Sequence, residues 1–244
     1  MAVLSAADLL ARLPERTRSH LQALLRALTE GLGPDLVAVL AHGSAVRGGY
    51  REDVSDVDLM VVLRRDEPDA LKLMANPLIL ARAAARIEAM ILRQDELESS
   101  ADVFPLLFRD IQRHHAVLHG VDPLRGVQVH DHHLRLRIEQ ELRDAQIRLR
   151  RLMVDEGGDA THMVGPMERK VKQMRSPLHA LMQLQGRDCA DDLQSVLRGA
   201  GQALSVDTTP LFHIREQPEA ALKVLRSLLT AAVKAADGHG AEAR

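Results

Sequence analysis

The chain has 244 residues, of which 46% are hydrophobic, so it is long enough to bury one large core or two small ones. Its formal net charge of −2 gives no general attraction to nucleic acid, and three Phe, one Tyr and no Trp offer few rings for stacking on bases, which argues against a polymerase or an RNA-tailing enzyme. A single cysteine, Cys189, excludes an intramolecular disulfide framework. Without a leader pattern or a long apolar stretch, we expect a cytoplasmic protein with no membrane partner.

Helix and strand patterns alternate in the first half of the chain. Residues 5–30 carry leucines at helical spacing, interrupted at Pro14 and ended by two glycines. The apolar run Leu36–Ala41 stops at a Gly-Ser turn, which predicts a buried strand. A second buried strand is expected where Leu59–Leu63 follows two alternating carboxylates.

Three further elements are expected before residue 125. A long helix is predicted from about Pro68 to Leu97, with a break at Asn76-Pro77. A third strand is predicted around Leu106–Ile111, and Val117–His119 is a candidate short strand.

Strand patterns end after Gly126, and helical periodicity takes over. Apolar residues recur at intervals of three and four in four segments, residues 134–152, 163–181, 191–204 and 218–236. Four helices with short loops are typical of an up-and-down bundle. We therefore predict an α+β chain, with a mixed sheet and flanking helices in residues 1–125 and an all-α helical bundle in residues 126–244.

The turn after the first strand has the residues of a phosphate-binding loop. Gly43 has no side chain, so successive backbone N–H groups can point into one concavity and donate to phosphate oxygens, and the Ser44 hydroxyl adds a donor. Arg47 follows within one helical turn, where its guanidinium can meet a phosphate. His42 is expected to line the same site. Gly43, Ser44 and Arg47 are therefore candidate nucleotide-binding residues.

Asp56 and Asp58 open the second strand. Residues two apart on a strand share a face, so both carboxylates project into the mouth of the site. They offer the oxygen ligands that Mg²⁺ or Mn²⁺ takes beside substrate phosphates. With 34 acids in the chain, the alternative is a chance pair of surface acids after an ordinary turn. The conjunction with the Gly-Ser turn and two buried strands favours metal-assisted phosphoryl chemistry.

These residues resemble a known signature. HGSAVRGGY (residues 42–50) followed by SDVDLMVVL (residues 55–63) is similar to the motif of the nucleotidyltransferase superfamily, which includes DNA polymerase beta, aminoglycoside adenylyltransferases and minimal nucleotidyltransferases. A weaker resemblance to bacterial adenylyltransferase-like members extends over Asp102–Leu124. The resemblance implies that residues 1–125 form a nucleotidyltransferase domain. It implies that Gly43-Ser44 binds the triphosphate and that Asp56 and Asp58 bind divalent metal.

A third carboxylate on a later strand is common in that superfamily, and its position is open in this sequence. Where the resemblance places an acid, this chain has Leu107. Asp110 and Asp102 are the nearest substitutes, and a site without the third acid is the remaining alternative. On a strand, Asp110 would share a face with Phe108, which makes it a candidate catalytic residue. Loss of the acid would leave nucleotide binding intact and put turnover in doubt.

Other polar groups have two interpretations each. Lys170 and Lys172 lie on a predicted helix, where two-domain relatives use basic groups to bind triphosphate, although solvated helix charges explain them as well. His130, His132 and His133 form a candidate zinc site, or a polar linker in which Asp131 caps the next helix.

The sequence supports two hypotheses from different classes. The first is an enzyme that uses Mg²⁺ or Mn²⁺ to transfer a nucleoside monophosphate, AMP from ATP, to a hydroxyl of a small molecule or protein, with release of pyrophosphate. The second is a nucleotide-binding protein with weak or no turnover that acts on a partner as antitoxin-like members do. Neither hypothesis fixes the oligomeric state, a homodimer included.

Overall fold

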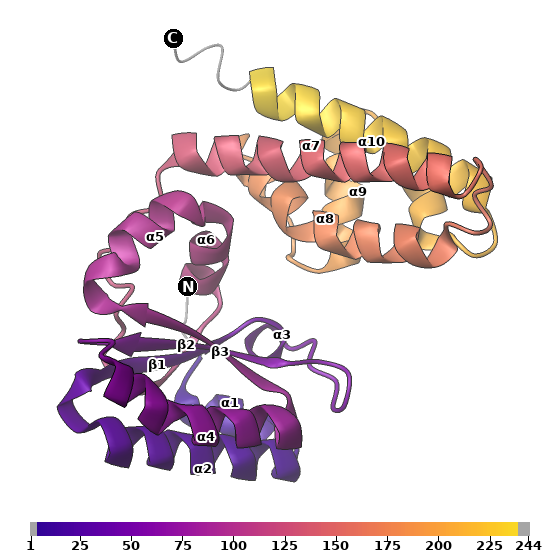
Figure 1. Cartoon of the computed structure of the whole chain (residues 1–244). Helices are drawn as coiled ribbons and strands as arrows, with labels where there is room; N and C mark the ends of the chain where they lie inside the picture. The colour runs from indigo at the N-terminus through magenta and orange to yellow at the C-terminus, as the bar shows by residue number, and fades with distance from the viewer. Residues whose placement is uncertain (1–3, 239–244) are drawn as a thin grey trace. The chain divides into compact units, whose positions relative to one another are not determined.

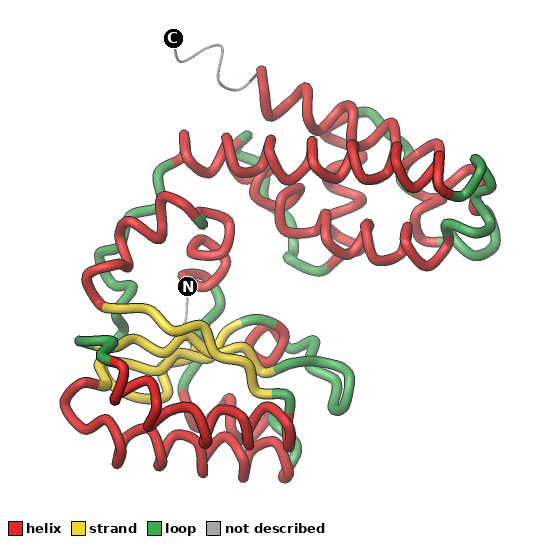
Figure 2. Tube along the Cα trace, in the orientation of Figure 1, coloured by secondary structure: helices red, strands yellow, loops and turns green. Residues whose placement is uncertain are grey.

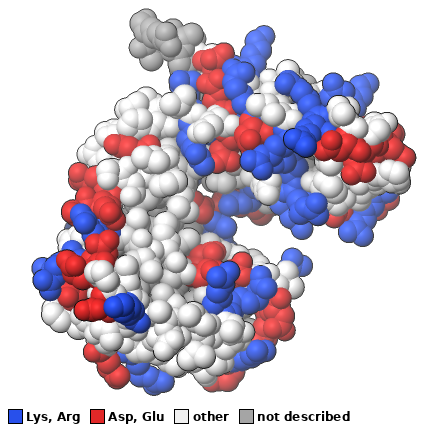
Figure 3. Space-filling view, in the orientation of Figure 1, with Lys and Arg blue, Asp and Glu red and all other residues white. Residues whose placement is uncertain are grey.

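The computed structural model describes residues 4–238 of the chain (Figure 1). Contacts between residues divide the chain into two compact units, one up to Val129 and one from His130 onward. Acidic and basic side chains are interspersed over the visible surface of each unit (Figure 3), in keeping with the small net charge. Within residues 4–238, no helix has the length and apolar character needed to cross a membrane.

The first unit is built on a four-stranded mixed sheet (Figure 2). Its strands are β1 (Leu36–His42), β2 (Val57–Leu63), β3 (Ile87–Arg93) and β4 (Ala116–Gly120), in the order β3-β2-β1-β4. β1 pairs antiparallel with both β2 and β4, and β2 pairs parallel with β3. β1 and β2 are therefore central strands with both faces covered, which explains why both are almost wholly apolar.

Helices cover the two faces of this sheet (Figure 1). One face packs against α1 (Ala6–Arg12), α2 (Glu15–Leu32) and α4 (Pro68–Ala85), and the other against α5 (Leu97–Val103) and α6 (Pro105–Arg113). Three short elements connect them: η1 (Gly33–Asp35), α3 (Ser44–Arg47) and η2 (Gln94–Glu96). The strands alternate between two separate cores, with Val39 in the first and Leu40 in the second.

The prediction of one helix from Pro68 to Leu97 is wrong in its second half. α4 ends at Ala85, and Arg86 caps it in the left-handed conformation, with φ 52°. The chain then turns directly into β3. The predicted break at Asn76-Pro77 is also absent, because α4 continues through Pro77 with Met74 and Ala81 buried on either side of it.

The predicted strand at Leu106–Ile111 is wrong as well, because these residues lie in α6. Pro105 stands at the start of the helix, where its fixed φ is favourable and its missing N–H costs nothing. Phe108 and Ile111, three residues apart, are both fully buried, which is the spacing of a helical stripe. The predicted strands at Leu36–Ala41, Leu59–Leu63 and Val117–His119 are confirmed as parts of β1, β2 and β4.

The second unit is all helical in its described residues, as predicted. It contains α7 (Asp131–Asp155), α8 (Val164–Leu184), α9 (Leu193–Leu204), η3 (Thr209–Phe212) and α10 (Pro218–Gly238). α7 packs against α8 and α10, and α8 packs against α9 (Figure 1). The predicted N-cap of α7 is wrong by one residue. His130 occupies the cap and Asp131 begins the helix, where its negative charge complements the helix dipole.

Candidate active site

The turn that follows β1 requires glycine at position 43 for two reasons. Gly43 has φ 70°, a conformation that other residues rarely adopt. A Cβ atom at this position would overlap the Asp58 carboxylate and lie 3.1 Å from its Cγ. The first hydrogen bond of α3 runs from the Val46 N–H to the Gly43 carbonyl, 3.3 Å. The N–H groups of Ser44 and Ala45 precede this bond and have no acceptor within α3, so they can donate to a ligand.

Strand register places three polar residues in one row across the sheet. His42 on β1 pairs with Asp58 on β2, and Asp58 pairs with Glu88 on β3. Two residues along the same strands, Leu40, Met60 and Met90 belong to the core beneath α5 and α6. Because side chains two apart share a face, His42, Asp58 and Glu88 all project on the α5–α6 side. Asp56 lies two residues before Asp58 and therefore shares its face. Asp56, Asp58 and Glu88 together form an acidic group next to the Gly43 turn.

Two arginines from the end of α4 pair with these acids. Arg86 Nη2 lies 2.7 Å from Asp56 Oδ1, and Arg82 Nε lies 2.8 Å from Glu88 Oε1. Asp58, the more buried acid between them, makes no ion pair among the described residues. The outer two carboxylates of the group are thus neutralised by cations, and the central one is not.

Burial and nearby charges shift the pKa values of Asp58 and His42. The pKa of Asp58 rises to about 6, chiefly because burial disfavours the charged carboxylate and then because Asp56 is close. The pKa of His42 falls to about 4, chiefly because burial disfavours the imidazolium. At neutral pH the row therefore contains an ionised, electrostatically unfavourable Asp58 beside a neutral His42.

Arg47 and Asp110 form a half-buried ion pair beside the same row. Arg47 ends α3, and Asp110 lies on α6 above this face of the sheet. Both charges act on Asp58, whose pKa Arg47 lowers and Asp110 raises. The structure thus brings together Gly43, Ser44, Arg47, Asp56, Asp58 and Asp110, all predicted from the sequence, and Asp110 arrives on a helix instead of a strand.

Comparison with known proteins assigns the family. The model of the nucleotidyltransferase domain matches residues 21–146, more than half of the chain. The chain belongs to the nucleotidyltransferase family. It is accordingly an enzyme of nucleotidyl transfer. No curated protein matches its sequence significantly.

A solved structure has a similar fold. It is spectinomycin adenyltransferase AAD(9) from Enterococcus faecialis, determined with ATP and spectinomycin. The two structures superpose with a TM-score of 0.50 at 13% sequence identity, over 90% of this nucleotidyltransferase and 98% of the other chain. The likeness therefore extends over both units and shows the fold.

Glu88 is a candidate site residue that the sequence analysis missed. It lies beside Asp58 because β2 and β3 run parallel in register. A signal for it exists in the sequence: Ile87-Glu88-Ala89-Met90-Ile91 repeats the pattern of Val57-Asp58-Leu59-Met60-Val61, an acid in second place before an apolar run. Asp102, by comparison, is exposed on α5, and Leu107 lies on α6.

The acidic group fits a divalent metal ion. Asp56, Asp58 and Glu88 offer carboxylate oxygens, the hard ligands that Mg²⁺ and Mn²⁺ prefer. Asp56 and Glu88 already hold cationic guanidinium groups. Burial and then the nearby charge of Asp56 raise the pKa of Asp58, and a bound cation would favour its ionised form.

The remaining candidates lie in the second unit. Lys170 and Lys172 are on α8, where Lys170 Nζ donates to Gln173 Oε1 at 3.1 Å. The rings of His130 and His132 stack at the start of α7 with centroids 5.6 Å apart, and His133 lies next to His132. Within the described residues, the nitrogens of these three histidines do not converge as metal ligands do.

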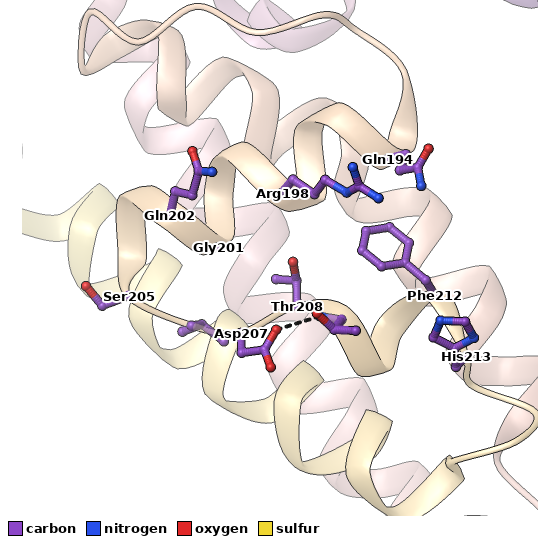
Figure 4. A pocket seen from close by; sticks show the side chains of 11 residues that line it. Gln194, Arg198, Gly201, Gln202, Ser205, Asp207, Thr208, Phe212 and His213 are labelled. Atoms are coloured by element: carbon purple, nitrogen blue, oxygen red, sulfur yellow. Dashed lines mark hydrogen bonds between the residues drawn. The ribbon is translucent and has the colours of Figure 1, made fainter.

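The second unit also contains a pocket of about 750 Å³ between α9 and the residues that follow it (Figure 4). The Arg198 guanidinium lies 5.6 Å from the centroid of the Phe212 ring, and the Thr209 N–H donates to Asp207 at 3.0 Å. Asp207 is the one acid in its described lining. The pocket lacks the paired carboxylates of nucleotidyl transfer, which places the candidate active site in the first unit.

Proposed function

We propose that this nucleotidyltransferase is a Mg²⁺-dependent adenylyltransferase that transfers AMP from ATP to a hydroxyl group of a small-molecule acceptor. The observation that carries the proposal is the register of β2 and β3, which sets Glu88 beside Asp58 on the face next to the Gly43 turn. The fold shared with an adenyltransferase that was solved with ATP and spectinomycin supports ATP as donor and a small molecule as acceptor.

Each residue near the turn has a proposed role in binding. The N–H groups after Gly43 and the Ser44 hydroxyl donate to phosphate oxygens of ATP. Asp56 and Asp58, with Glu88 beside them, would hold the metal ion, which when bound neutralises charge on the triphosphate and on the pyrophosphate leaving group. Arg47 binds phosphate, and its ion pair with Asp110 orients the guanidinium.

Glu88 is the proposed general base. Its carboxylate accepts the proton of the acceptor hydroxyl as that oxygen forms a bond to the α-phosphorus. The bond between the α-phosphorus and the oxygen bridging to the β-phosphate breaks, and pyrophosphate leaves with the electron pair. Asp110 is the second candidate for this role. The sequence has no acid at Leu107, and Glu88 offers a third carboxylate in its place. This supports an enzyme with turnover over a binding module.

The test is transfer of label from ATP. With Mg²⁺ and a panel of hydroxylated acceptors that includes spectinomycin, ATP labelled with 32P at the α-phosphate should label the acceptor, and ATP labelled at the γ-phosphate should not. Glu88→Gln should slow turnover at least about 100-fold, the usual contribution of a general base. Asp69→Asn removes a charge from an acid on α4 whose side chain is 92% exposed, and it should leave turnover unchanged.

Two results would contradict the proposal. Full turnover of Glu88→Gln with loss of turnover in Asp110→Asn would transfer the role of base to Asp110. Tight binding of ATP with no pyrophosphate released in the presence of any acceptor would support the binding-module alternative.

A further inference from the structure

The two arginines at the end of α4 pair with the outer carboxylates of the acidic group. Arg86 contacts Asp56 at 2.7 Å and Arg82 contacts Glu88 at 2.8 Å, both at the distance of a charge-assisted hydrogen bond. The two arginines are four residues apart, on the helix that leads directly into the strand that carries Glu88. Residues of one short segment thus neutralise both outer carboxylates of the acidic group.

The backbone at Arg86 is fixed independently of its side chain. Its N–H donates to the Arg82 carbonyl at 2.9 Å, and its carbonyl accepts from the Val57 N–H at 3.0 Å, which joins the end of α4 to the start of β2. Arg86 adopts φ 52°, a conformation for which glycine is the usual residue at a helix end. The fold therefore needs a left-handed residue here, and arginine is not the residue that the backbone favours.

Both guanidinium groups can leave their carboxylates. The side chains of Arg82 and Arg86 are 69% and 51% exposed, so each has solvent to move into. Exposed ion pairs are weak, because water and salt screen them. Asp58, between the two pairs, holds no cation of its own among the described residues.

We propose that Arg82 and Arg86 are resident counter-ions of the metal site, which a divalent cation must displace from Glu88 and Asp56. The inference rests on the proposed function. A free metal ion can bind these carboxylates only if both ion pairs break. A metal ion that arrives with a nucleoside triphosphate brings a polyanion, which gives the displaced guanidinium groups new partners. The two arginines thus make the site selective for the metal–nucleotide complex over the free ion.

The experiment is a titration of the metal-free full-length protein with Mn²⁺, followed by electron paramagnetic resonance, with and without a non-hydrolysable ATP analogue. Arg86→Gly should bind free Mn²⁺ about two- to five-fold more tightly than the wild type, the range expected for one exposed ion pair. Arg82→Gln should act in the same direction, and the double variant should bind more tightly than either. Binding of Mn²⁺ with the analogue should strengthen less, so the selectivity for the complex should fall.

A measurement of unfolding and one control variant separate this role from alternatives. Arg86→Gly keeps a residue suited to φ 52° and should unfold at the same temperature as the wild type or higher, so tighter Mn²⁺ binding cannot be attributed to a damaged helix end. Arg65→Gln removes the same charge from an arginine of the first unit that pairs with Asp35, and it should leave Mn²⁺ affinity at the wild-type value.

Unchanged or weaker Mn²⁺ binding in both Arg86→Gly and Arg82→Gln, or an equal gain in Arg65→Gln, would overturn the inference. If AMP transfer continues in that case, the proposed function stands without it. If the wild type neither binds Mn²⁺ with the analogue nor transfers AMP, the proposed function fails first. The two failures are therefore distinguishable.

Discussion

Replacing Asp58 by asparagine is expected to stabilise the metal-free protein while it removes metal binding. Asp58 is held between Asp56 and Glu88, and burial together with these neighbours raises its pKa from 3.8 to about 6. The folded state therefore holds the Asp58 proton more tightly than the unfolded state does. The ionised carboxylate consequently costs stability at every pH above this range.

The magnitude follows from the change in pKa. At about 1.36 kcal/mol for each pKa unit, a rise from 3.8 to about 6 corresponds to about 3 kcal/mol at pH 7. Solvent still reaches part of the Asp58 side chain and screens it, so we reduce this to about 1–2 kcal/mol. The cost is absent below about pH 3.8 and fully developed above about pH 6. Asp58→Asn should therefore gain about 1–2 kcal/mol at pH 7 and nothing near pH 3.8.

The assay is thermal unfolding in the presence of EDTA, with Mn²⁺ binding measured on the same samples. A gain of 1–2 kcal/mol should raise Tm by about 3–6 °C at pH 7. Asp69→Asn, the exposed control on α4, should leave Tm within about 1 °C. A variant Asp58→Asn that is less stable than the wild type at pH 7, or that gains equally at pH 4, would refute the reasoning, because the carboxylate would then not be in electrostatic conflict with its neighbours.

Two further changes test the turn and the buried histidine. Gly43→Ala should destabilise the first unit by about 1–2 kcal/mol and weaken ATP binding, because φ 70° and the Asp58 carboxylate both oppose a Cβ atom. Gly49→Ala is the matched control, because a Cβ atom there meets no atom within 4 Å. Equal denaturant midpoints for the two variants would contradict the prediction. The pKa of His42 is about 4 in the folded state against 6.5 in the unfolded state, so neutral His42 contributes up to about 3 kcal/mol to the free energy of unfolding above pH 6.5, and this is lost as the pH falls to 4. In urea titrations, His42→Gln should therefore lose less stability than the wild type between pH 6.5 and pH 4. Equal losses in the two proteins would contradict the prediction.

The sequence predicts the elements whose signals are local. β1 and β2 are buried on both faces, so each is a nearly unbroken apolar run that ends or begins at a polar motif. β3 lies at the edge of the sheet and follows α4 with only Arg86 as a break, so no Gly or Pro marks the change from helix to strand. The Leu106–Ile111 run is rich in bulky apolar residues, and its helical state depends on Pro105 and on packing against the sheet.

In the candidate active site, too, the residues with local sequence signals are predicted and the residue placed by strand pairing is not. Gly43, Asp56 and Asp58 lie within 16 residues of one another, and their meaning follows from one turn and one strand. Glu88 comes 30 residues after Asp58 and reaches it only through the parallel pairing of β2 with β3. A parallel pair requires a crossover helix, so the register between the two strands cannot be predicted from the sequence of either strand alone.

The neutral state of His42 is as important for a metal site as the ionised state of Asp58. The two residues are cross-strand partners, and burial moves the pKa of His42 down to about 4 and that of Asp58 up to about 6. Above pH 6 the carboxylate is therefore charged and the imidazole is not. A protonated His42 would give Asp58 a fixed counter-ion that no ligand could displace, because the ring is buried, whereas Arg82 and Arg86 are exposed and can move. Among the described residues, Asp58 therefore makes no ion pair with a buried group, and its charge is available to a cation that enters from solvent.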